Sequence, residues 1–124
     1  MGLTFQANSQ VDYYTDLANE YQREYMINKN KAEKLDTEAG SYLRLAMEYR
    51  RLADSCAQSN DTAQFTQYLK KAEEVEVKGQ SCLMMAKEAR LLYIDQFKLY
   101  QDALSKMLRA RQREEEDLRI RSNW

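Results

Sequence analysis

The chain has 124 residues, of which 31% are charged and 44% hydrophobic, and its 19 basic residues nearly balance its 20 acidic ones. It contains no proline and no histidine, three glycines and two cysteines. Without proline we expect long helices, because proline is the commonest break between shorter elements. Without histidine the chain lacks the usual general base and the commonest metal ligand. We therefore expect an all-α domain that is not an enzyme, with no catalytic residue, no metal and no cofactor.

The net charge of −1 provides no overall attraction to nucleic acid or to an anionic membrane. The first ten residues, MGLTFQANSQ, carry no positive charge and no apolar run of signal-peptide length. No window approaches the roughly 18 apolar residues of a membrane span. We expect a cytoplasmic protein with no membrane partner.

A seven-residue apolar repeat begins after residues 1–8, which we expect to be a flexible N-terminus. One position of the repeat holds Val11, Ala18, Tyr25, Ala32, Ala39, Ala46 and Ala53. The other holds Tyr14, Tyr21, Asn28, Leu35, Tyr42, Tyr49 and Cys56. Thirteen of these fourteen residues are apolar or aromatic, and Asn28 is the exception. Seven repeats in register predict a helix of the coiled-coil type.

The segment Ser59–Asp61 interrupts this repeat, and Asp61 is a good N-cap for a second helix. The second repeat has one position at Phe65, Ala72, Gly79, Ala86, Tyr93, Tyr100 and Met107. Its companions are Tyr68 or Leu69, Val75, Cys82 or Leu83, Ala89, Phe97, and Ala103 or Leu104. Residues 9–108 are thus predicted to form a long antiparallel helical hairpin, coiled-coil-like, with its turn at 59–61. Apolar residues face each other when paired numbers sum to about 118, which sets Tyr21 opposite Phe97 and Asn28 opposite Arg90.

Gly40 and Gly79 fall at the same height in this hairpin. Each is either a tolerated glycine inside a helix, at a cost of about 1 kcal/mol, or a break. Breaks would let residues 41–78 fold back and form a four-helix bundle within one chain. In the unbroken hairpin Cys56 and Cys82 lie roughly 30 Å apart by helix rise. An intramolecular disulfide would therefore indicate the folded-back form.

The stretch from Cys82 to Leu108 is more apolar than one partner helix requires. Met84, Leu91 and Ile94 lie outside the predicted seam. Because a helix that is apolar on most of its circumference needs more than one neighbour, we expect these residues to bind a partner. The partner is another protein or a second copy of the chain, as a homodimer or a complex subunit.

Residues 109–124 are expected to form a charged helical tail. Its arginines are Arg109, Arg111, Arg113, Arg119 and Arg121, and they flank four consecutive acidic residues. We expect Arg113–Asp117 and Glu115–Arg119 to pair along the helix. The tail overshoots the N-terminus in the predicted register. Its apolar residues Leu118, Ile120 and Trp124 are then free to bind a partner.

These patterns favour a non-catalytic helical module for protein–protein interaction, acting as an adaptor, a small complex subunit or an inhibitor through exposed apolar faces. The alternative is a nucleic-acid-associated helical protein that uses the arginines of the tail. The acidic residues between these arginines weaken the positive electrostatic field that would attract a phosphate backbone.

Overall fold

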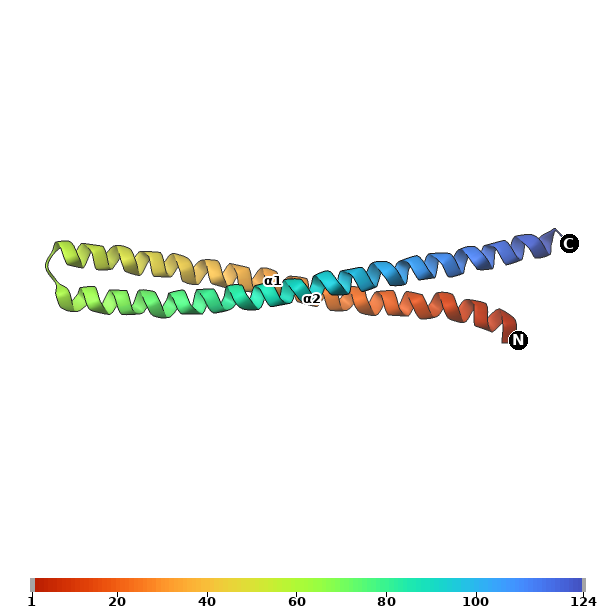
Figure 1. Ribbon diagram of the computed structural model, residues 1–124, viewed down its shortest axis with the longest axis horizontal. Coiled ribbons are helices and arrows are strands. Elements are labelled where there is room, and N and C mark those ends of the chain that lie inside the picture. The colour runs from red at the N-terminus through yellow and green to blue at the C-terminus, as the bar shows by residue number, and fades with distance from the viewer. Residues whose placement is uncertain (1, 124) are drawn as a thin grey trace. The chain divides into compact units, whose positions relative to one another are not determined.

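The computed structural model describes the backbone of residues 2–123 and the side chains of residues 10–123. Helix α1 spans Gly2–Gln58 and helix α2 spans Thr62–Ser122, and this part of the chain contains no strand. Figure 1 shows the two helices joined by a short turn. The all-helical prediction is confirmed. The side chains before Gln10 lie outside the described part of the chain. The flexibility expected for residues 1–8 therefore stays a prediction.

The turn lies at Ser59–Asp61, as predicted. Asn60 adopts a positive φ of 58°, a conformation that asparagine tolerates better than most residues. The Asp61 amide donates to the carbonyl of Cys56 at 2.9 Å, a bond that closes the end of α1. The Asp61 carboxylate then accepts from the Gln64 amide at 3.2 Å and caps the start of α2.

The chain forms two compact units, and each contains a part of both helices. Lys29–Arg90 form the turn unit, and the residues up to Asn28 together with those from Leu91 onward form the terminal unit. The predicted division into a hairpin at 9–108 and a tail at 109–124 stays a prediction.

Within the units, the predicted repeat makes up the interface between the helices. All fourteen repeat positions of α1, and all seven of the main column in α2, are buried or half-buried. Among the side chains that the structure describes, the buried apolar residues are ten alanines and Leu35. Small side chains let the two backbones approach closely, but each buried CH₂ contributes only about 0.8 kcal/mol. The helices therefore share a thin core.

The turn unit is an antiparallel helical hairpin. Tyr49 of α1 stacks on Tyr68 of α2 with ring centroids 6.2 Å apart. Arg50 pairs with Glu76, and Arg90 donates to Asp36 at 2.6 Å. The tyrosine pair belongs to the interface, and the two ion pairs join the helices at more exposed positions.

Gly40 and Gly79 lie inside α1 and α2, so neither ends a helix. The folded-back alternative required helix ends at these glycines, and the structure has none there. The two glycines differ in their surroundings. A Cβ on Gly79 would lie 3.1 Å from Cγ and Cδ2 of Leu43, whereas the nearest atom to a Cβ on Gly40 is Nη1 of Arg44 at 3.8 Å. Only Gly79 is required by a close approach of the helices.

In the terminal unit, the pairing of α1 residues with α2 residues differs from the predicted register by about one helical turn. The ring of Tyr25 contacts Phe97, with centroids 5.2 Å apart, where Tyr21 was expected. Asn28 donates to Oε1 of Gln96 at 2.8 Å instead of facing Arg90. The half-buried companion of the seam is Gln96, seven residues after Ala89, and Phe97 is exposed. Gln96 accepts the shorter hydrogen bond of the half-buried Asn28 amide, which also donates to the Glu24 carbonyl at 3.4 Å, so this polar group of the seam is satisfied.

The new register also changes the tail. Ala110 is buried, so the first part of the tail packs against α1 and does not overshoot it. Arg113–Asp117 and Glu115–Arg119 are not among the ion pairs of the described residues, so the predicted pairing along the tail is wrong. The terminal unit has instead an ion pair between Lys106 and Asp102 at 3.1 Å.

Candidate functional site

Exposed apolar side chains of the terminal unit are concentrated, in the described residues, at the beginning of its part of α2. Within nine residues, five large apolar side chains are between 39% and 57% exposed. They are Leu91, Leu92, Ile94, Phe97 and Leu99. Single exposed apolar side chains are normal on a protein surface, whereas a cluster of this size is typical of an interaction site.

The predicted partner residues are exposed wherever the structure describes them. Leu91 and Ile94 belong to this cluster, and Met84 is exposed in the turn unit. Leu118 and Ile120 are exposed in the tail, and Trp124 lies outside the described residues.

The sequence prediction missed a second apolar line on α2 within the terminal unit. Its positions alternate in steps of three and four, as in a coiled-coil seam. They are Ile94, Phe97, Gln101, Leu104 and Leu108. Leu104 is half-buried and the other four are exposed. The spacing is readable from the sequence, but the sequence also places Phe97 among the companions of the first seam, and that interpretation hides the second line.

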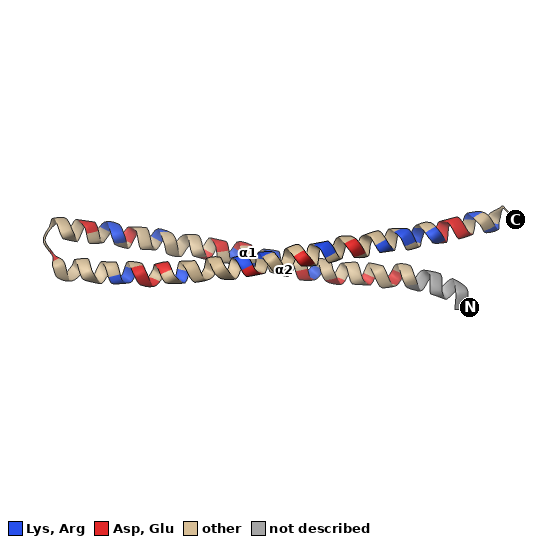
Figure 2. Cartoon of the chain, in the orientation of Figure 1, with Lys and Arg blue, Asp and Glu red and all other residues tan. Residues whose placement is uncertain are grey.

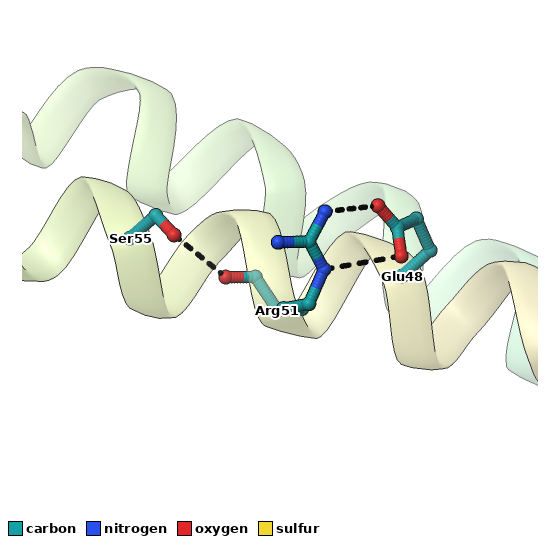
Figure 3. Close-up of polar contacts among 3 residues, drawn as sticks. All are labelled: Glu48, Arg51 and Ser55. Carbon is teal, nitrogen blue, oxygen red and sulfur yellow. Dashed lines mark hydrogen bonds and ion pairs between the residues drawn. The ribbon is translucent and has the colours of Figure 1, made fainter.

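Charges are distributed along both helices with the two signs intermixed (Figure 2). One local pair on α1 shows their usual geometry. The Arg51 guanidinium donates to both carboxylate oxygens of Glu48, and the Ser55 hydroxyl donates to the Arg51 carbonyl at 3.3 Å (Figure 3). The hydrogen bonds from Arg51 hold the pKa of Glu48 below its ordinary value. This pair is solvent-exposed, so it is a feature of the surface rather than of a reacting centre.

The predicted nucleic-acid residues Arg109, Arg111, Arg113, Arg119 and Arg121 all have exposed side chains. Arg109 and Arg113 line a cleft of about 220 Å³ between the helices of the terminal unit, together with Lys106, Tyr14 and Gln10. No carboxylate lines this cleft, although the hydrogen bond to Asp102 raises the pKa of Lys106. A larger hollow in the tail mixes three arginines with two glutamates. The cleft is thus the more cationic of the two.

The remaining groups of chemical interest are the two cysteines and the acidic side chains. Cys56 and Cys82 are both free and half-buried. In the described residues, no group of three or more cysteine or acidic side chains is arranged to hold a metal ion. The described helices include no stretch long and apolar enough to cross a membrane.

No protein-family model, curated protein or solved structure matches the chain. The functional argument therefore depends on the surfaces described above.

Proposed function

We propose that this protein is a non-catalytic helical module for protein–protein interaction that binds through the exposed apolar faces of α2. Such a module serves as an adaptor, a small complex subunit or an inhibitor. The observation that supports the proposal is the cluster of five exposed apolar side chains in residues 91–99. Large apolar surfaces rimmed by polar residues are typical of sites where proteins associate.

The thin core of the helices supports the same proposal. In residues 10–123 the buried apolar residues are ten alanines and one leucine, so the packing of the two helices against each other gains little free energy. Burial of leucine, isoleucine and phenylalanine side chains against a partner contributes about 1.5–3 kcal/mol for each fully buried residue. Association then provides apolar burial that the two helices by themselves lack. A cytoplasmic location remains part of the proposal.

The test replaces Met84, Leu91 and Ile94 with glutamine in one variant. We expect the helical circular dichroism signal to be retained, because glutamine is a good helix former, and association with itself or with a captured partner to be lost. The matched control replaces Ile27 and Met47 of α1 with glutamine. These two residues are 61% and 70% exposed, against 44% to 67% for the three residues of the test, and the control should behave as the wild type. Unchanged sedimentation together with unchanged partner capture by the triple variant would refute the proposal.

A second candidate function is nucleic-acid binding, which is favoured by the cationic cleft of Lys106, Arg109 and Arg113. Phosphate contacts of this kind weaken steeply as salt rises. An R109Q/R113Q variant should then lose retention on a polyanion column, and the R44Q/R51Q variant of the turn unit is the control for total charge. If the wild type is not retained at low salt, this candidate is eliminated.

A further inference from the structure

The second apolar line on α2 has the spacing of a helix-packing seam. Ile94, Phe97, Gln101, Leu104 and Leu108 follow steps of three, four, three and four residues. This spacing keeps side chains on one stripe of an α-helix and fits knobs-into-holes packing against another helix. The ligand that this line suits is therefore a helix, rather than an extended peptide or a flat surface.

In the turn unit, the same line along α2 carries charged residues. Continued backwards along α2 with the same steps, it runs through Arg90, Lys87, Leu83, Gln80, Glu76 and Glu73. There the charged residues are used within the hairpin, because Arg90 pairs with Asp36 and Glu76 pairs with Arg50. In the terminal unit the line carries no charge from Ile94 to Leu108, and its charged residues resume at Arg111 and Glu115. Exposed apolar side chains grouped between charged residues are typical of a site that a partner covers.

The helix α1 does not cover this line. Phe97 contacts the ring of Tyr25, yet it remains 39% exposed, and Ile94 and Leu108 are 44% and 50% exposed. The intramolecular seam already uses the other side of α2, at Ala103 and Ala110. A further helix is needed to bury the line.

The surface area indicates how much a partner could cover. The chain exposes 9565 Å², whereas a folded monomer of 14.7 kDa exposes about 6,900 Å². The excess is about 2,700 Å², and one partner of a standard interface buries only about 800 Å². A stable dimer is therefore well within the area that the chain has available.

We infer that the occupant of this line is the same line on a second copy of the chain, so that two copies pack their α2 helices together and build a four-helix arrangement. The inference rests on the proposed function and names the partner. A second copy carries a seam of identical spacing, and the net charge of −1 causes little repulsion between copies. Ile94 and Leu108 each lie seven residues from Gln101, with Phe97 four residues before it and Leu104 three after it. A two-fold axis near Gln101 therefore sets Ile94 against Leu108 of the copy and the Gln101 amide against the copy's amide, where each can donate and accept.

The first experiment is sedimentation of the full chain over a range of concentrations. We expect the wild type to be a dimer and the I94Q/L108Q variant to dissociate with a Kd raised by about 100-fold or more. Circular dichroism checks that the variant stays helical. The I27Q/M47Q variant of α1 is the matched control and should remain dimeric. A wild type that is monomeric at all concentrations overturns the inference, as does a dimer that I94Q/L108Q leaves intact.

The second experiment does not depend on a destabilising change. In a chain with C56S and C82S, Gln101→Cys should form a disulfide between copies under mild oxidation, because residues at a two-fold axis face each other. Asp95→Cys, on another side of α2, should not. Absence of cross-linking by Gln101→Cys overturns the inference.

These experiments distinguish failure of the self-association from failure of the proposed function. A monomeric wild type that still captures a partner through Met84, Leu91 and Ile94 overturns the self-association and leaves the proposed function standing.

Discussion

The two internal glycines provide a sharp test of how closely the helices pack. Gly40 and Gly79 both lie in helix interiors, where alanine is favoured over glycine by about 0.5–1 kcal/mol. The perturbation is the pair of single variants Gly40→Ala and Gly79→Ala. Both gain the same helix propensity, so any difference between them reports the space around the added methyl group.

At Gly40 the nearest obstacle to the methyl group is the flexible end of Arg44 at 3.8 Å, which is ordinary contact. We expect Gly40→Ala to raise the free energy of unfolding by about 0.5–1 kcal/mol. At Gly79 the methyl group would lie 3.1 Å from two carbons of Leu43 and 3.3 Å from Cβ of Tyr42. Forcing extra volume into a packed interface costs about 1–3 kcal/mol, so Gly79→Ala should be less stable than Gly40→Ala by about that amount.

The assay is urea unfolding followed by circular dichroism, with all variants at one protein concentration because association would add to the apparent stability. A double-mutant cycle identifies the clash. Replacing Leu43 with alanine removes the two carbons at 3.1 Å, so Gly79→Ala should be more favourable in that background by about 1 kcal/mol or more. If Gly79→Ala stabilises the wild type as much as Gly40→Ala does, the close approach at Gly79 is not tightly packed and the reasoning is refuted.

Three further predictions concern single groups. Asn28→Leu should stabilise the helices but relax their register, and paramagnetic distances between the helices should then show more than one pairing, whereas one unchanged pairing would contradict the role of the amide. Cys56 and Cys82 should both react with a thiol reagent in the folded chain and form no intramolecular disulfide, since the Gln64 that lies beside Cys56 is separated from Cys82 by about 27 Å of helix rise; a monomeric disulfide on a non-reducing gel would contradict this. The pKa of Glu48 measured by NMR should lie below its ordinary value and return to it in Arg51→Gln. The stabilisation from this pair is present above the unfolded pKa and is lost as the pH falls through the lowered folded pKa, and an unchanged titration in the variant would show that Arg51 is not the cause.

The seam itself was predictable because a seven-residue repeat specifies one stripe of a helix, whatever packs against it. Each of the fourteen expected positions of α1 is buried or half-buried. The turn was predictable for a local reason, since Asn60 and Asp61 are residues that accept a positive φ and cap a helix. The exposed positions of Met84, Leu91 and Ile94 followed from the same periodicity.

What the sequence by itself determined is therefore the kind of element, the stripe that each helix buries and the point at which the chain turns, because these depend on nearest neighbours along one helix. The register was decided only by tertiary contacts. An alanine-rich seam can slide by one helical turn and still set apolar side chains against apolar ones, so composition does not distinguish the registers. The bond from Asn28 to Gln96, the rings of Tyr25 and Phe97 and the space at Gly79 select one of them, and that choice in turn leaves Phe97 free to join a second line on α2.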